Sequence, residues 1–136
     1  MSEDFPDVEE GMRQYLRADA DVQARVAQRV FFGIPRAGAE FPLITLSRAG
    51  GGEQPGEAPV DQALINISCW GGASKQEAWN AAAAVRKALF KIRARTLLAP
   101  GVYAFGAQVD GVIWSPDPAD DRPRYTLTVE VTGISS

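Results

Sequence analysis

The sequence has 136 residues, the size of one folded domain, since most domains contain about 100–150 residues. Its 46% hydrophobic and 23% charged residues are typical of a globular protein and exclude intrinsic disorder for most of the chain. The net charge of −3 argues against a freestanding nucleic-acid-binding protein, because affinity for phosphate grows with clustered lysine and arginine.

The chain begins with the acidic segment MSEDFPDVEEGM, which contains no apolar run. We therefore expect neither a secretion signal nor a transit peptide there, and we expect residues 1–6 to be disordered. No part of the sequence approaches the ~20 apolar residues of a membrane span, so no membrane is expected among its partners. Residues 1–136 are predicted to form a single domain.

Two short helices are predicted near the amino terminus. Residues 7–17 form the first, because acidic residues favour its initial turn and apolar residues follow at helical spacing. The second begins after Asp19, a suitable N-cap residue. It continues through valines spaced four residues apart until the Phe31-Phe32 pair changes the pattern.

Two strands joined by a long connection are predicted next. Residues 43–48 are rich in β-branched residues, and residues 62–70 alternate between apolar and polar side chains. Between them, residues 49–60 (AGGGEQPGEAPV) contain four glycines and two prolines. This composition predicts a flexible loop without regular structure.

A long helix is predicted after Gly71-Gly72, because Ser74 and Glu77 have the spacing of a capping box. Behind them runs a continuous apolar stripe: Ala78, Ala82, Val85, Leu89 and Ile92. From Lys75 to Arg95 six basic residues stand against one acidic residue. This basic cluster either complements the helix dipole or faces a polyanion, and the sequence leaves both interpretations open.

The remaining segments predict further strands. Residues 102–105 and 108–114 form one strand interrupted at Gly106 or two pieces with a bulge there. After the turn SPDPADDRP, residues 124–134 alternate as a final strand. The predicted fold class is α+β: a mainly antiparallel sheet of four to five strands, with one long and one or two short helices packed on one face.

The residues suited to chemistry are few. The chain has no histidine, which excludes histidine bases and ligands, and the single Cys69 is interpreted as a small buried strand residue. Three aspartates of the 115–123 turn lack EF-hand spacing and are interpreted as solvated turn residues. The glycine run at 50–52 is not followed by the Lys-Ser/Thr pair of a phosphate-binding loop. We therefore expect no catalytic residue, no cofactor and no metal.

The aromatic and polar surface residues are interpreted more simply. Trp70 and Trp79 are expected to close one end of the core, whereas Trp114 precedes the acidic turn and is expected to be partly exposed. The outward residues of the last strand form a polar face that suits either another subunit or solvent: Thr126, Thr128, Glu130 and Thr132.

Several features recur together over about Asp7 to Ile134. They are the two short helices, the Arg29-Val30 pair before a proline-containing link, the strand FPLITLSR, the strand ALINISCWGGASKQEAW and the helix AAAAVRKAL. In this layout the sequence resembles the tail terminator, or tail completion, proteins of long-tailed phages and related gene transfer agents. The resemblance is one of layout and carries no catalytic signature.

The resemblance implies a virion structural protein, assembled in the host cytoplasm, that forms a hexameric ring at the head-proximal end of the tail tube. Such a ring ends tube polymerisation and supplies the head-joining surface. The implied partners are further copies of the chain, the major tail tube protein, a head–tail connector or head-closure protein, and genomic DNA passing through the lumen.

No residue roles transfer from the family, so the candidate surfaces come from this sequence alone. The candidates for a subunit or tube contact are Arg48, Gly50, Gly51, Gly52, Glu53, Gln54 and Glu57. The candidates for a DNA-facing lumen are Arg86, Lys87, Lys91 and Arg93.

Three alternatives stay open. The chain is a head–tail connector or minor tail protein of similar fold, an enzyme that uses carboxylates or a metal, or an adaptor that binds peptides by strand addition. An enzyme of that kind requires a concave cluster of acids, for which Asp110, Asp117, Asp120 and Asp121 are the candidates.

Overall fold

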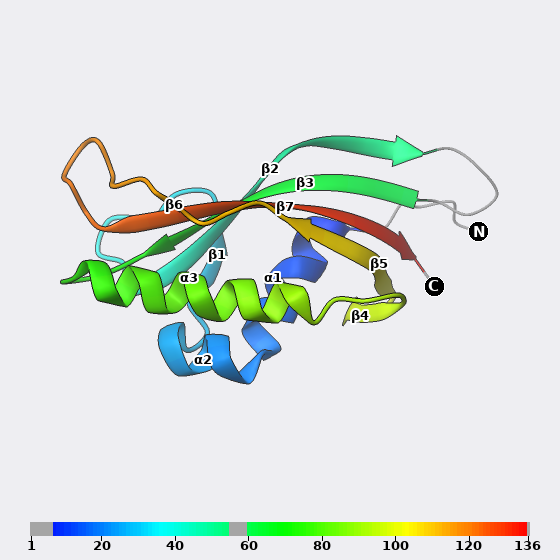
Figure 1. The fold of residues 1–136 in the computed structure, drawn as a ribbon, viewed down its shortest axis with the longest axis horizontal. Coiled ribbons are helices and arrows are strands. Elements are labelled where there is room, and N and C mark those ends of the chain that lie inside the picture. The colour runs from blue at the N-terminus through cyan, green and yellow to red at the C-terminus, as the bar shows by residue number, and fades with distance from the viewer. Residues whose placement is uncertain (1–6, 55–59, 136) are drawn as a thin grey trace.

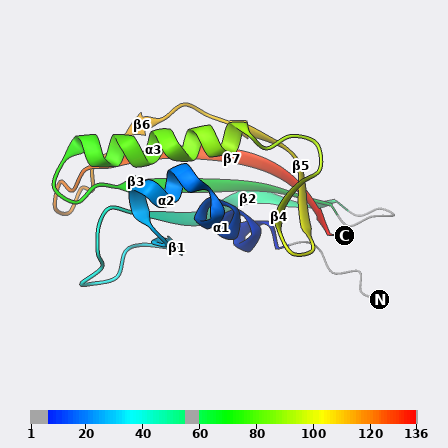
Figure 2. The same ribbon diagram turned by 90° about the horizontal axis from the view of Figure 1, so that it is seen from below.

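The computed structural model describes residues 7–54 and 60–135, in which three helices lie on one face of a seven-stranded sheet (Figures 1 and 2). The predicted α+β class is confirmed. In chain order the elements are α1 (Val8–Ala18), α2 (Ala20–Val26), β1 (Val30–Phe32), β2 (Leu43–Gln54), β3 (Val60–Trp70), α3 (Lys75–Phe90), β4 (Thr96–Ala99), β5 (Val102–Val109), β6 (Ile113–Trp114) and β7 (Arg124–Ser135).

The sheet has the strand order β1-β2-β3-β7-β5-β4, with β6 paired to β7 beyond the end of β5. Strands β3 and β7 pair over their whole lengths at the centre, and β1 pairs with β2 in parallel. Every other ladder is antiparallel. The prediction of a mainly antiparallel sheet therefore holds, but four to five strands were too few.

Each helix begins where the sequence predicts, because a side chain accepts a backbone N–H at each start. Asp7 accepts from Glu10, Asp19 accepts from Asp21 and Val22, and the Ser74 hydroxyl accepts from Glu77 N–H at 3.2 Å. The Glu77 carboxylate accepts in return from the N–H groups of Gly72 and Ala73, at 2.9 and 2.8 Å. These caps satisfy donors that the first helical turn leaves without a backbone partner.

The core lies between the helices and the sheet. The predicted apolar stripe, which runs along α3 from Ala78 and ends at Ile92 just after the helix, is buried, and so are Ile65, Ile67 and Cys69 on the facing side of β3. Burial raises the pKa of the Cys69 thiol, so this residue is packed as an apolar side chain. The Tyr15 hydroxyl of α1 donates to the carbonyl of Ala88 at 2.7 Å and so ties α1 to α3.

Two short strands were missed by the sequence analysis. The pattern placed Val30 at the end of a helix, but Val30 is fully buried in β1 and pairs with Ile44. The four residues of β4 were not predicted to be regular at all. Both strands are too short to show an alternating pattern. Their conformation is set by the longer strand beside each, and this information lies outside the segment itself.

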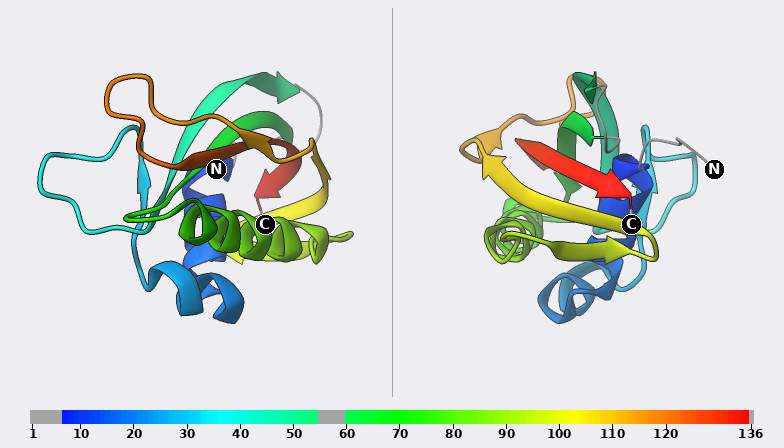
Figure 3. Two further views of the ribbon diagram at one scale, coloured as in Figure 1. Left: turned by 60° about the vertical axis from the view of Figure 1, so that its left-hand side comes forward. Right: turned by 90° about the vertical axis from the view of Figure 1, so that its right-hand side faces the viewer.

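The region between Val102 and Trp114 forms two pieces. Strand β5 runs through Gly106 with a shift of register between Ala104 and Gly106, which is the predicted bulge, and β6 is separate. The sheet curls at this end, so that β4 packs beside α1 (Figure 3). Gly11 lies at this contact, where a Cβ atom would stand 3.1 Å from Val102 Cγ1 and 3.3 Å from Leu98 Cβ. A glycine inside α1 permits this close approach.

Candidate assembly surfaces

The glycine-rich segment after Arg48 is a strand and not the predicted flexible loop. Residues 50–54 continue β2 and pair with residues 60–64 of β3, after a bulge between Arg48 and Gly50. Residues 55–59, which include Glu57, lie outside the described residues. The glycines that favoured a loop in isolation are held here by backbone hydrogen bonding to a long neighbouring strand, and backbone pairing does not need a side chain.

In the part of the chain that the structure describes, the outer edge of β2 has no partner strand beyond the short strand that covers its beginning, although the backbone N–H of Arg48 donates to Glu9 and the carbonyl of Gly50 accepts from Arg48 Nε. Strand β1 pairs only with Ile44, Thr45 and Leu46, and within the described ranges no strand pairs with the outer side of residues 47–54. Figure 3 shows this part of β2 on the side of the sheet remote from α2 and α3. An open strand edge of this length is a site at which another chain is able to add.

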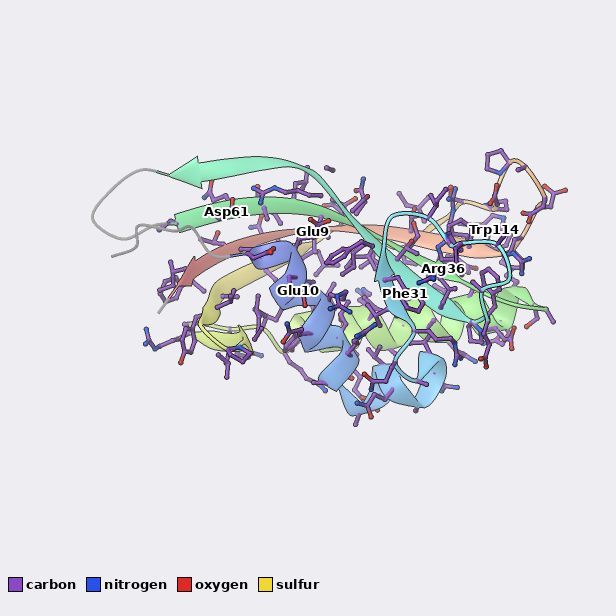
Figure 4. All side chains as sticks on the ribbon, turned by 180° about the vertical axis from the view of Figure 1, so that it is seen from behind. Glu9, Glu10, Phe31, Arg36, Asp61 and Trp114 are labelled. Carbon is purple, nitrogen blue, oxygen red and sulfur yellow. The ribbon has the colours of Figure 1, made fainter. Side chains whose placement is uncertain are left out.

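Arg48 stabilises the base of this hairpin. Its guanidinium forms two hydrogen bonds with the carboxylate of Asp61 across the β2–β3 ladder, at 2.5 and 2.6 Å, and Asp61 is 1% exposed. The backbone N–H of Arg48 donates to Glu9 Oε2 of α1 at 3.0 Å. Glu9 and Asp61 lie at this end of the sheet in Figure 4. Arg48, a predicted interface residue, therefore joins the hairpin to the helical layer.

The basic cluster at the end of α3 is partly neutralised within the chain. Lys91 Nζ lies 3.0 Å from Oδ2 of Asp19, the N-cap of α2, and Lys87 Nζ lies 3.3 Å from Oδ2 of Asp21 in the first turn of α2. The hydrogen bond to Asp19 raises the pKa of Lys91. Arg86 stacks over Phe90, with its guanidinium carbon 4.7 Å from the ring centroid. The pairing of this cluster with the acidic start of α2 is not predictable from the sequence, because the two elements are far apart along the chain.

An aromatic group lies where α3, β6 and β7 meet. The ring centroid of Tyr125 lies 5.2 Å from that of Trp79 and 5.0 Å from that of Trp114. Lys75 Nζ lies 4.7 Å from the ring centroid of Trp114. Trp114 is 41% exposed, as predicted, but Trp79 is 44% exposed and does not close the core. We call this surface the β6 margin and define it by Trp79, Asp110, Ile113 and Trp114.

Trp70, by contrast, fills the core as predicted. It is 4% exposed, and its indole N–H donates to the Thr45 hydroxyl at 3.0 Å. The guanidinium carbon of Arg124 lies 4.8 Å from its ring centroid.

A second apolar surface lies at the other side of the sheet, along β1 and the link that follows it. Phe32 is 43% exposed and Ile34 is 83% exposed. The guanidinium of Arg13 lies 5.4 Å from the Phe32 ring centroid, and Arg36 lies exposed two residues after Ile34. We call this surface the β1 margin and define it by Phe32, Ile34 and Arg36. Arg36 and Phe31 are marked in Figure 4.

The 34–41 link also borders the acidic turn that connects β6 and β7. Together they line an open groove of about 600 Å³. Within this groove Arg122 stacks on Phe41, with its guanidinium carbon 3.9 Å from the ring centroid. In this turn Asp117 accepts from Ala119 N–H at 2.8 Å and Asp120 accepts from Arg122 N–H at 3.0 Å. Among residues 7–54 and 60–135, no three acidic or cysteine side chains gather in an arrangement that suits a metal ion.

None of the described helices is long and apolar enough to cross a membrane. The described surface offers a strand edge on β2 that no strand covers and two apolar margins, all of which suit association with other chains.

Comparisons with known proteins assign the chain to a family. The model of the family described as tail completion protein gp17 matches residues 10–129. Twenty-six chains of solved structures also match. One belongs to a structure described as the virion of a native gene transfer agent particle, with a TM-score of 0.68 and 22% identity over 94% of this chain and 95% of that one, a likeness of fold. Curated protein sequences give no match. Because the family model spans most of the sequence, this chain belongs to the tail completion protein gp17 family, whose members are structural proteins of the virion tail.

Proposed function

We propose that this chain caps the head-proximal end of the tail tube as a ring, stops polymerisation of the tube protein and supplies the surface to which the head joins. The observation that carries the proposal is the family match over residues 10–129. The role requires a stable scaffold with surfaces for association and makes or breaks no bond, so the chain is proposed to act without catalysis. The partners are further copies of the chain, the tube protein and a head–tail connector protein.

The open edges of the sheet support this proposal. Beyond Leu46 the outer edge of β2 has no partner strand, and beyond Ala104 the same holds for β5 within the described residues. Unpaired edges are a liability for a protein that stays monomeric, because other chains add to them. In a subunit that closes into a ring and docks on a tube, the same edges become contacts.

The β2–β3 hairpin is the proposed contact with the tube, as the sequence led us to expect for residues 48–57. The Arg48–Asp61 pair and the hydrogen bond from Arg48 to Glu9 fix the direction of the hairpin relative to α1. A hairpin held in this way loses little conformational freedom on docking, which favours affinity.

The DNA-facing role proposed for the end of α3 rests mainly on Arg86 and Arg93. Lys87 and Lys91 are held by the acids of α2, so less of their charge is available to phosphate. Each phosphate contact adds about 0.9 to the slope of log affinity against log salt concentration. In fluorescence-anisotropy titrations of duplex DNA against the assembled protein, Arg86→Gln with Arg93→Gln should therefore lower that slope. An unchanged slope contradicts the lumen assignment.

The main test polymerises purified tail tube protein with and without this chain and measures tube length by negative-stain microscopy. We expect growth to stop at ends that carry a ring. If tubes grow to the same lengths and their ends are bare, the capping proposal is wrong. Binding to a purified connector without any effect on tubes would favour the alternative role as a head–tail connector.

A hairpin variant tests the proposed contact separately. Glu53 pairs with Asp61, so residues 54–60 are replaceable by Asn-Gly, a two-residue turn that suits a β-hairpin and keeps the Arg48–Asp61 pair. We expect this variant to fold but to leave tubes uncapped. The control is Asp121→Gly in the turn at the other end of the sheet, where φ is +57° and glycine fits. A shortened hairpin that still caps tubes contradicts the assignment.

A further inference from the structure

Large exposed hydrophobic side chains are unevenly distributed over the molecule. Within the described part of the chain they gather along the two sides of the sheet, with Phe90 on α3 as the exception. One side carries Phe32 and Ile34. The other carries Trp79, Leu97, Phe105, Ile113 and Trp114. Exposed apolar patches of this kind mark interaction sites on soluble proteins.

The β1 margin and the β6 margin lie on opposite sides of the sheet. Strand β1 begins the sheet order, whereas β6 pairs with β7 on the side that leads to β5 and β4. Figure 2 shows β1 and β6 on opposite sides of the sheet, at the same end of the long strands. A translation and rotation of one copy would therefore bring its β1 margin against the β6 margin of the next.

Each margin also carries a charge without a partner in the described residues, and the two charges are opposite. Arg36 and Asp110 are exposed, and within residues 7–54 and 60–135 neither side chain forms a hydrogen bond or an ion pair, although Arg36 lines the same groove as Asp117 and Asp120. Arg36 lies two residues from Ile34, and Asp110 lies three residues before Ile113. Charge complementarity of this kind sets the orientation of partners and disfavours wrong pairings.

We infer that the β1 margin of one copy docks on the β6 margin of the next copy, with Arg36 facing Asp110. The inference rests on the proposed ring and names the surfaces that form it. Two different surfaces on opposite sides give a head-to-tail contact, which closes into a ring when the rotation between neighbours divides a full turn. In such a ring every subunit buries both margins. A single partner of another kind would cover one of them and leave the other in water.

A charge exchange tests the pairing of surfaces. Arg36→Asp and Asp110→Arg each place like charges together and should weaken assembly at least about tenfold, measured by native mass spectrometry over a range of concentrations. The two substitutions in one chain restore opposite charges and should restore assembly. Arg25→Glu, an exposed reversal on α2, is the control and should assemble as the unmodified protein does. Single variants that assemble normally, or a double variant no better than the singles, overturn the inference.

Cysteine crosslinking tests the head-to-tail direction. Ile34→Cys and Ile113→Cys together should give a ladder of crosslinked oligomers on oxidation, whereas either substitution alone should stay uncrosslinked. Cys69 is fully buried and does not compete. A crosslinked dimer from one substitution alone would show that like surfaces meet, which contradicts the inference.

Both experiments are run with and without tube polymers, so that rings which form on tube ends are also captured. Absence of rings from the unmodified protein under both conditions refutes the ring itself. Rings that withstand the charge reversals and give no crosslinked ladder refute only the choice of surfaces.

Discussion

The ion pair between Arg48 and Asp61 is unequally buried, and its two single variants should therefore differ in stability. The side chain of Asp61 is 1% exposed, whereas that of Arg48 is 28% exposed. Arg48→Leu leaves a buried carboxylate without its cation, which costs about 3–5 kcal/mol in pairs of this kind. Asp61→Asn leaves a guanidinium that still reaches water, so we expect a smaller loss of about 1–3 kcal/mol.

Urea unfolding followed by tryptophan fluorescence measures both losses, and a thermal scan checks them at about 3.5 °C per kcal/mol for a chain of this length. The double variant Arg48→Leu with Asp61→Leu should be more stable than Arg48→Leu alone, because it contains no unpaired buried charge. If Asp61→Asn proves the more damaging single variant, or if the double variant loses the sum of both singles, the argument from unequal burial is refuted.

Two further predictions concern the packing and the pH dependence of the fold. Gly133→Ala should destabilise by about 1–3 kcal/mol, because the new Cβ would lie 2.6 Å from Val8 Cγ2, whereas Gly106→Ala meets nothing within 4 Å. Thermal unfolding of the two variants measures the stability that each loses. Equal losses of stability would contradict the steric clash as the cause. The backbone N–H groups of Ala73 and Gly72 lower the pKa of Glu77 below its ordinary value of 4.5. Because the folded value is the lower one, Glu77 stabilises the fold above pH 4.5 and loses this contribution as the pH falls through the folded value. Glu77→Gln should flatten that part of the pH profile of the urea midpoint, and an unchanged slope would contradict the capping role.

The helices could be predicted because their signals are local. The capping pair Ser74 and Glu77 and the buried stripe behind them lie within one segment, and the structure confirms both. The alternation in β3 and β7 was equally informative, since each of these strands is covered by helices on one face. The margins were missed because Phe32 and Ile113 lie in strands of three and two residues, which are too short to show a period. The only local indication of the margins was a pair of apolar residues, at 31–32 and at 113–114, each followed within two residues by a glycine or a proline.

The glycine run of β2 shows how tertiary pairing overrides local preference. Four glycines and two prolines between residues 49 and 60 favour a loop in any isolated chain. In the fold, β7 holds β3 in place as far as Val60, and the backbone of residues 50–54 completes its hydrogen bonds against that strand. The paired backbone groups offset the conformational freedom that the glycines lose on forming the strand.

The order of the helices and of the long strands, the buried face of each of these elements and the lack of histidine chemistry were determined by the sequence itself. The tertiary structure decided which surfaces remain for association. Lys91 is bound to Asp19 from 72 residues away, and the rings at the β6 margin come from three elements. A side chain's helical or strand position depends on its neighbours in sequence, but its exposure and its free charge depend on neighbours that the fold brings from elsewhere.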